Sequence, residues 1–129
     1  MRPVRLLFDI HVGRKLERPL RRDFPNTELS RLGKPHTPPC TATDPEILLW
    51  CEQNQTLFVS GDRKTMPRHH ADHLQAGHHS WGVFVLRRQA SLKGTIDDML
   101  AVLGASDAED WIDFIDYLPF RSSAPSQPA

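Results

Sequence analysis

Three aspartates stand where a fold could bring carboxylates together. Asp9 lies at the end of an apolar run, Asp62 follows a second apolar run, and Asp44 opens a segment with helix-start signals. In an open parallel sheet, ligands bind beyond the carboxyl ends of the strands. Carboxylates that meet at such an edge repel one another unless a hard cation with oxygen ligands neutralises them. The pattern therefore predicts a divalent-metal site in which Asp9, Asp44 and Asp62 are the catalytic and metal-binding acids.

Basic residues accompany these acids. Arg63 and Lys64 follow Asp62 directly, and Arg87 and Arg88 end a later apolar run. An acidic metal pocket with basic residues around it suits a phosphodiester substrate, because metals activate water and cations hold phosphates. The residues expected to contact substrate phosphate are Arg63, Lys64, Arg87, Arg88 and Arg14.

Several of these residues also have a purely structural interpretation. Asp62 can make a turn, and Glu46 fits the spacing of a helix capping box. The pair Arg87-Arg88 can be a solvated strand end. Asp9 is harder to explain in this way, because a carboxylate that ends a buried apolar strand costs free energy unless it is paired or liganded.

Histidines form a second cluster, at positions 69, 70, 73, 78 and 79. His69 and His73 are four residues apart and share one face of a predicted helix, as two zinc ligands would. The glutamate of a zinc-protease motif is absent, however, and Gly77 is expected to end the helix before His78. A zinc or nickel site at His69 and His73 is one hypothesis, and a solvated polar face or contacts to the substrate are the alternatives.

These residues need a scaffold that places strand ends side by side. The predicted strands span residues 4–10, 27–32, 56–60, 82–87 and 112–118, and the predicted helices span 13–23, 43–54, 66–76 and 95–103. Pro19 is expected to shorten or break the first helix, and Gly104 to end the last one. Strands that alternate with helices predict an α/β fold, a three-layer α/β/α sandwich with a mostly parallel sheet.

The composition limits the classes of function. The chain has 129 residues, with 16 Lys and Arg against 16 Asp and Glu, so its formal net charge is zero. This balance argues against a polycation that binds nucleic acid over a whole face. We expect one domain over residues 1–120 and a disordered tail over 121–129. Cys40 and Cys51 cannot build a disulfide framework and no apolar run could span a bilayer, so a cytoplasmic location with no membrane contact is expected.

Four short motifs occur in a recognisable order. They are Leu6-Leu7-Phe8-Asp9-Ile10-His11, Asp44-Pro45-Glu46-Ile47-Leu48, Val59-Ser60-Gly61-Asp62-Arg63 and Gly82-Val83-Phe84-Val85-Leu86. In these motifs the chain resembles the PIN-like proteins, relatives of the PIN-domain ribonucleases that act as bacterial toxins. One subgroup of that family also shows the features found here as Thr65-Met66, Ala76-Gly77, Trp111 and Tyr117-Leu118-Pro119. The resemblance extends over residues 4–120.

This resemblance implies an α/β/α sandwich with carboxylates that bind Mg²⁺ or Mn²⁺ at the sheet edge and support cleavage of RNA. Asp9 and Asp62 match core acids of the family, and Asp44 matches the acid that opens its helix. The chain departs from the family where Asp9 is followed by Ile10 and where Arg63-Lys64-Thr65 replaces a second aspartate. Three acids can hold one Mg²⁺, which keeps several waters. A second metal would need a further ligand, and the candidates are Glu46 and Asp97.

Two hypotheses of function follow. The first is a metal-dependent PIN-like endoribonuclease that cleaves RNA, the toxin of a toxin–antitoxin pair with an antitoxin protein as its partner. The second is a PIN-like module with an impaired site that acts through a protein partner. The lost acids favour the second hypothesis, as does the separation of basic N-terminal from acidic C-terminal residues. A homodimer is a further expectation.

Overall fold

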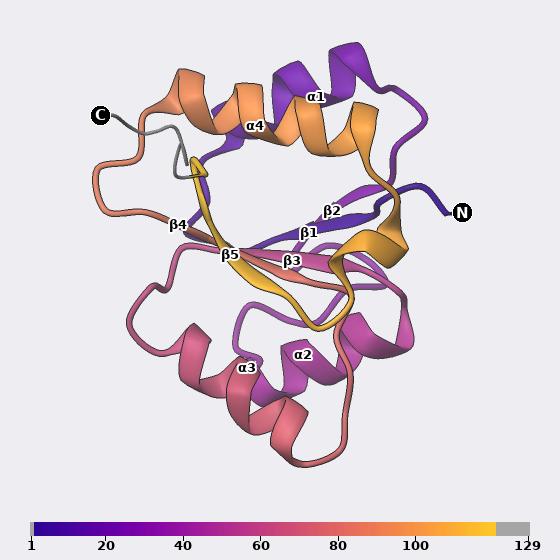
Figure 1. Ribbon diagram of the computed structural model, residues 1–129, viewed down its shortest axis with the longest axis vertical. Coiled ribbons are helices and arrows are strands. Elements are labelled where there is room, and N and C mark those ends of the chain that lie inside the picture. Colours follow the sequence, from indigo (N-terminus) through magenta and orange to yellow (C-terminus); the bar gives the residue numbers. More distant parts are fainter. Residues whose placement is uncertain (1, 121–129) are drawn as a thin grey trace, which may run out of the picture.

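Five short strands form a single parallel sheet (Figure 1). The computed structural model describes residues 2–120, so the tail over 121–129 that we expect to be disordered lies outside the described residues. The strands are β1 (Leu6–Phe8), β2 (Leu29–Arg31), β3 (Leu57–Ser60), β4 (Val83–Leu86) and β5 (Ile115–Leu118). Their order across the sheet is β2-β1-β3-β4-β5, and all neighbouring pairs are parallel.

Helices cover both faces of this sheet. They are α1 (Glu17–Asp23), α2 (Asp44–Gln53), α3 (Met66–Gln75) and α4 (Leu92–Ala105), with short 3-10 segments η1 (Arg14–Leu16) and η2 (Ala108–Trp111). α1 and α4 lie on one face and α2 and α3 on the other (Figure 1), which confirms the predicted three-layer α/β/α fold. Because α2 and α3 both return from the carboxyl edge of the sheet to its amino edge, they pack side by side in the same direction. Within residues 2–120, no helix is long and apolar enough to cross a membrane.

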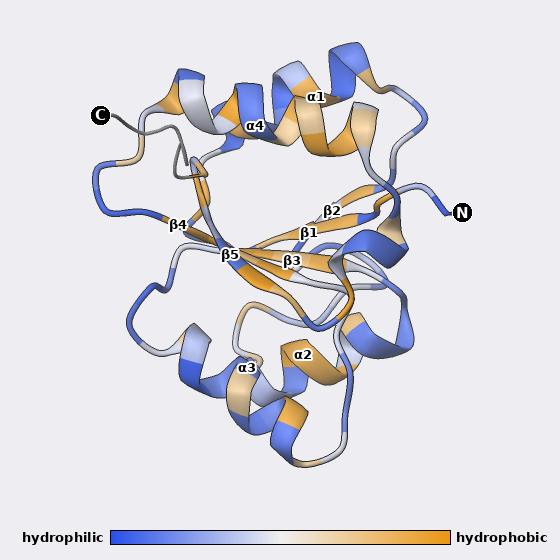
Figure 2. Cartoon of the chain, viewed as in Figure 1, coloured by the Kyte–Doolittle hydropathy of each residue, from blue (hydrophilic) through white to orange (hydrophobic). Residues whose placement is uncertain are grey.

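The sheet separates two apolar cores, and its hydrophobic strands lie between helices with polar outer faces (Figure 2). Side chains of successive strand residues point to opposite faces, so neighbouring positions supply different cores. The core beneath α1 and α4 contains Phe8, Val59, Phe84, Leu20 and Met99. The core beneath α2 and α3 contains Leu7, Phe58, Val85, Leu48 and Met66. Both faces of the sheet are therefore buried, as near-continuous apolar strands require.

Two helix boundaries differ from the sequence expectations. The predicted helix over 13–23 is divided into η1 and α1, and Pro19 lies in the first turn of α1, where its missing N–H breaks no helical hydrogen bond. The prediction that Gly104 ends the last helix was wrong. α4 begins after the capping residue Ser91 and continues through Gly104. A Cβ at position 104 would lie 3.2 Å from the Phe24 ring, so the glycine lets α4 pack closely against the end of α1.

The strand order changes direction between β1 and β3. β1 has β2 on one side and β3 on the other, so the connections after these strands diverge. Divergent connections leave a crevice beyond the carboxyl ends of the two strands, which is where open α/β sheets bind ligands. Phe8 pairs with Val59 in the sheet register, so the residues that follow β1 and β3 meet at this crevice.

Candidate functional site

Asp9 follows β1 directly and is buried, with 9% of its surface exposed. Its Oδ2 accepts the N–H of Gly61 at 3.3 Å, and its own N–H donates to the carbonyl of Val59 at 2.9 Å. Among residues 2–120, no basic side chain forms an ion pair with Asp9 and no hydrogen bond reaches its Oδ1. A carboxylate in such surroundings is costly as an anion unless a cation joins it.

A threonine links the other two aspartates. The Oγ1 of Thr65 donates a short hydrogen bond to Asp62 Oδ2 and lies 3.5 Å from Asp44 Oδ2. Asp62 Oδ1 accepts the N–H groups of Lys64 at 3.1 Å and Thr65 at 3.0 Å, which closes the turn before α3. The bond from the Thr65 hydroxyl is the largest reason why the pKa of the Asp62 carboxyl lies below its usual value. Asp62 therefore makes a turn, and the same turn brings it next to Asp44.

His69 joins this group from α3. Its Nδ1 lies 2.8 Å from Asp44 Oδ2, whereas Asp44 Oδ1 accepts no hydrogen bond from the part of the chain that the structure describes. Asp44 is the first residue of α2, and His69 lies in the first turns of α3. The pair therefore connects the N-terminal ends of two neighbouring helices, at the carboxyl edge of the sheet.

Arg31, the last residue of β2, fixes the loop after Asp9. Its Nη1 donates to the carbonyl oxygens of Asp9 at 2.9 Å and Val12 at 2.7 Å. Its Nε donates to Glu17 Oε2 at 2.6 Å, and its Nη2 forms a second, shorter bond to the same carboxylate. Both charged side chains are largely buried, at 8% and 12% exposure. The position of the Asp9 backbone therefore depends on a buried ion pair between β2 and α1.

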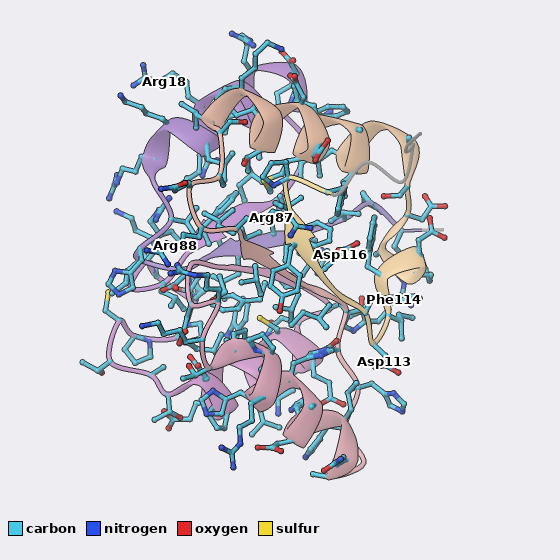
Figure 3. All side chains as sticks on the ribbon, turned by 60° about the vertical axis from the view of Figure 1, so that its left-hand side comes forward. Arg18, Arg87, Arg88, Asp113, Phe114 and Asp116 are labelled. Carbon is cyan, nitrogen blue, oxygen red and sulfur yellow. The ribbon has the colours of Figure 1, made fainter. Side chains whose placement is uncertain are left out.

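The basic residues expected to hold phosphate differ in their freedom. Arg63 and Lys64 are exposed in the turn between β3 and α3, and Arg88 is exposed after β4. Arg87 is instead held against the end of β5 (Figure 3), because its Nε donates to the carbonyl of Pro119 at 2.6 Å and its guanidinium lies over the ring of Tyr117.

Arg14 lies on a concave surface formed by the loop that follows Asp9. A hollow of 400 Å³ opens beyond the ends of β1 and β2, and no acidic side chain of residues 2–120 lines it. Its basic lining consists of Arg14, Lys34 and the engaged Arg31, and His11 borders it as well. This hollow is therefore suited to an anion at the loop after Asp9.

Glu46 and Asp97 have other partners. Glu46 Oε1 accepts the N–H of Thr43 at 2.8 Å and its hydroxyl at 3.0 Å, and the backbone bond is the main reason why the pKa of Glu46 is lowered. Asp97, on α4, forms an ion pair of 2.8 Å with Lys93. Glu46 thus has the capping role that the sequence offered as an alternative. Within residues 2–120, the predicted acids form no group of three whose ligand atoms all lie within 4.8 Å of one another.

A different group of three, also within residues 2–120, has ligand atoms that all lie within 4.8 Å of one another. It lies near the amino edge of the sheet. It consists of Glu52 in the last turn of α2, His73 in α3 and His78 just after α3. Glu52 Oε1 lies 3.3 Å from His73 Nε2 and 3.1 Å from His78 Nδ1. These three residues could hold a metal ion. The predicted pair of His69 and His73 is not the pair that the structure joins, since each contacts a different carboxylate.

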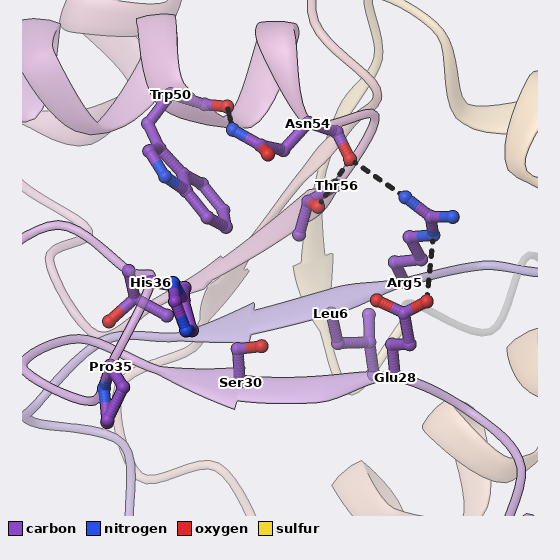
Figure 4. Close-up of a pocket in the computed structure, with 10 residues that line it drawn as sticks. Arg5, Leu6, Glu28, Ser30, Pro35, His36, Trp50, Asn54 and Thr56 are labelled. Carbon is purple, nitrogen blue, oxygen red and sulfur yellow. Dashed lines mark hydrogen bonds and ion pairs between the residues drawn. The ribbon is translucent and has the colours of Figure 1, made fainter.

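A further hollow, of 190 Å³, lies near the amino ends of β1 and β3 (Figure 4). Its polar groups bond to one another: Arg5 contacts Glu28 at 3.5 Å and the carbonyl of Asn54 at 3.4 Å. The Thr56 hydroxyl donates to the same carbonyl at 2.9 Å. Because these groups satisfy each other away from the carboxyl edge, this hollow is a weaker candidate for a ligand site.

The chain matches no protein-family model, no curated protein and no solved structure.

Sequence reasoning missed Arg31 and Glu17, whose contact across 14 positions has no motif. It also missed Glu52 and His78 as a pair. The available signal was Gly77, because a helix-ending glycine between His73 and His78 turns the second ring back toward the first.

Proposed function

We propose that the protein is a divalent-metal-dependent endoribonuclease of the PIN-like type, with Mg²⁺ or Mn²⁺ as its cofactor, and that it acts as the toxin of a toxin–antitoxin pair. Asp9 carries this proposal, as a carboxylate 9% exposed at the strand crevice with no ion-pair partner among residues 2–120. A buried carboxylate of this kind calls for a counter-charge, and a hard divalent cation is the counter-charge that prefers oxygen ligands.

The available oxygens suit a single ion. Asp9 Oδ1 and Asp44 Oδ1 are free of hydrogen bonds within residues 2–120, whereas both oxygens of Asp62 accept hydrogen bonds from its own turn. Mg²⁺ binds through one or two carboxylates and keeps several waters, so Asp9 and Asp44 are its direct ligands and Asp62 orients the site. Bound there, the ion would activate water and offset charge on a phosphodiester.

The basic hollow supports a nucleic-acid substrate. Arg14 and Lys34 line it, no acidic side chain of residues 2–120 does, and both are exposed, so they can contact a phosphate at the loop that follows Asp9. Arg63, Lys64 and Arg88 supply further exposed cations along the same edge of the sheet. Contacts of this kind position a backbone without reading its bases. The choice of RNA follows from the resemblance of the strand-end motifs to PIN-like proteins.

The test is cleavage of single-stranded RNA by tag-free protein with Mn²⁺ or Mg²⁺. Asp9→Asn should lower the cleavage rate by at least about 100-fold, because it removes the charged metal ligand. The same substitution should abolish the rise in melting temperature that Mn²⁺ gives the wild type. Asp23→Asn is the matched control, since the ion pair of this exposed carboxylate within residues 2–120 is with Arg22. Cleavage that survives EDTA or Asp9→Asn would refute the assignment.

A second candidate is a PIN-like module whose site no longer cleaves and which acts through a protein partner. It is favoured by the hydrogen bond from the Thr65 hydroxyl to Asp62 Oδ2, which takes up an oxygen that a metal would need. It is also favoured by the lack of a three-carboxylate group within 4.8 Å among residues 2–120. Calorimetric titration with Mn²⁺ separates the two candidates. Binding at sub-millimolar metal that Asp9→Asn removes supports the nuclease, and no binding supports the module.

A further inference from the structure

The group of Glu52, His73 and His78 owes its geometry to the way α3 ends. Ala76 is the C-cap of α3, and Gly77 follows with a φ of +93°. The Gly77 N–H donates to the carbonyl of Leu74 at 3.0 Å, and the His78 N–H donates to the carbonyl of His73 at 3.2 Å. These two bonds define a Schellman motif, which reverses the chain and returns the residue after the glycine to the helix. His78 therefore stacks on His73, with ring centroids 4.8 Å apart.

Helix packing brings a carboxylate to the two stacked rings. α2 and α3 run in the same direction, so the last turn of α2 lies beside the last turns of α3. Glu52 Oε1 lies 3.3 Å from His73 Nε2 and 3.1 Å from His78 Nδ1. Its other oxygen, Oε2, accepts the N–H of His79 at 3.1 Å, which fixes the direction of the carboxylate. Three side chains from two helices and a turn thus present ligand atoms within 4.8 Å of one another.

Two of the three spacings, those from Glu52 to each histidine, match the spacing of ligands around a small ion. Metal–ligand bonds of about 2.0–2.1 Å in a tetrahedral site place neighbouring ligand atoms about 3.4 Å apart. The observed contacts of Glu52 Oε1 with His73 Nε2 and His78 Nδ1 are 3.3 Å and 3.1 Å. Two imidazole nitrogens and one carboxylate oxygen favour Zn²⁺, Ni²⁺ or Cu²⁺ over the all-oxygen ions Mg²⁺ and Ca²⁺.

The geometry points to a transition-metal site formed by Glu52, His73 and His78, which takes Zn²⁺ and ties the end of α2 to the turn after α3. Three protein ligands leave a fourth position for water. The site lies at the opposite end of the helix pair from Asp44 and His69, so it is independent of the proposed nuclease centre.

Binding of a metal at His73 costs a hydrogen bond. His73 Nε2 also lies 2.9 Å from the carbonyl oxygen of His79, to which an Nε2–H donates when the ring carries its proton there. A metal at the same nitrogen requires the neutral ring to carry its proton on Nδ1 instead, so Zn²⁺ binding breaks the hydrogen bond to His79 without net release of a proton.

The test is calorimetric titration of Zn²⁺ into full-length, metal-free protein without a histidine tag. We expect one Zn²⁺ per chain, together with a higher melting temperature. His78→Gln and Glu52→Gln should each weaken binding by at least about 100-fold. His78 is 44% exposed and Glu52 28% exposed, so both variants should fold, which circular dichroism in EDTA checks.

His69→Gln is the matched control. It removes a histidine from the same helix that contacts Asp44 and not Glu52, so Zn²⁺ affinity should stay unchanged. The inference is overturned if the wild type binds no Zn²⁺, or if His78→Gln and Glu52→Gln leave binding intact. Loss of binding in His69→Gln would also overturn it, because the ligands would then be the i,i+4 pair of α3. Failure of RNA cleavage, by contrast, leaves this result untouched.

Discussion

The Arg31 guanidinium forms a buried ion pair with Glu17, in which Nε and Nη2 both donate to Oε2, and the same guanidinium holds the carbonyl oxygens of Asp9 and Val12. One side chain thus joins β2, α1 and the loop that carries the buried aspartate. The orientation of that loop depends on the electrostatics of a pair that lies outside the carboxylate site.

Substitution of Arg31 should therefore be costly. Arg31→Met removes the buried partner of Glu17 and leaves its carboxylate with the exposed Arg21 at 3.3 Å, so the free energy of unfolding should fall by at most about 3–5 kcal/mol, the cost of breaking a buried ion pair. Urea denaturation measures the loss. Arg22→Met is the control, because Arg22 pairs with Asp23 at 72% exposure and should change stability by less than about 1 kcal/mol. Equal effects of the two substitutions would contradict the structural role of Arg31.

Glycine at position 82 should be required for steric reasons. Its φ is +104°, and an added Cβ would lie 2.8 Å from Trp111 Cβ and 3.0 Å from the Trp111 carbonyl oxygen. Backbone strain and overpacking together should make Gly82→Ala lose about 2–4 kcal/mol of stability. Gly13→Ala is the matched comparison, since its φ is −63° and nothing lies within 4 Å of an added Cβ. Thermal melting should show that the Gly13→Ala variant is as stable as the wild type or slightly more stable.

The stability of the protein should fall below neutral pH through His70. Burial is the main reason why the pKa of His70 is lowered, His73 lowers it further, and Asp113 opposes the change. The unfolded chain therefore takes up this proton at a higher pH than the folded chain does. The contribution to stability is complete above the unfolded pKa of about 6.5 and is lost as the pH falls toward the lowered folded pKa.

Urea midpoints measured across this range for wild type and His70→Gln check the sign. The variant keeps a group that can bond to the Ser80 hydroxyl, which lies 2.7 Å from His70 Nε2. It has no ring to titrate, so its midpoint should fall less steeply with decreasing pH. An identical slope in the two proteins would assign the pH dependence to other groups.

The two thiols should differ in reactivity. Cys51 is 3% exposed, and burial raises the pKa of its thiol far above the usual value, so little reactive thiolate forms. Cys40 is exposed. Iodoacetamide should therefore label one thiol, Cys40, in the native protein and both in urea, as mass spectrometry of peptides would show. Equal labelling of both thiols under native conditions would argue against the packing of α2 on the sheet.

The basic hollow should control the salt dependence of RNA binding if the proposed function holds. Arg14→Ala or Lys34→Ala should each reduce the slope of log affinity against log salt by about 0.7, the value for one phosphate contact with a single strand. Arg18→Ala removes the same charge from the exposed surface of α1 (Figure 3) and should leave the slope nearly unchanged. A similar change in all three variants would mean that binding is a general effect of charge.

The fold follows from local patterns, and its departures from expectation have local causes. Apolar runs located β1, β3 and β4, whereas β2 and β5 were predicted from segments that also carry polar residues. The ladder is shorter than the run 4–10, since Ile10 is 42% exposed beyond the end of β1. Gly104 failed as a helix stop because its role is set by contact with Phe24, which no periodicity reveals.

The candidate sites also combine features that the sequence pattern predicts with features that only tertiary packing sets. Asp9 and Asp62 were predicted as neighbours because parallel strands end at one edge of the sheet. The register pairs Phe8 with Val59, and Asp9 Oδ2 accepts the N–H of Gly61, the residue before Asp62. The contact of Glu52 with His73 depends on how α2 packs on α3, which is a tertiary property. Individual roles in metal binding and catalysis stay predictions until the variants are measured.

Because α2 and α3 run parallel, their dipoles point the same way in a chain whose charges balance. Each helix carries a macrodipole equivalent to roughly +0.5 charge at its N-terminus and −0.5 at its C-terminus, and two parallel helices add rather than cancel. The positive ends lie beside Asp44 and Thr65, and the negative ends lie beside His73 and His78. In a molecule with a formal net charge of zero, these two helix dipoles thus favour anionic groups such as carboxylates and phosphates at one edge of the sheet and cations at the other.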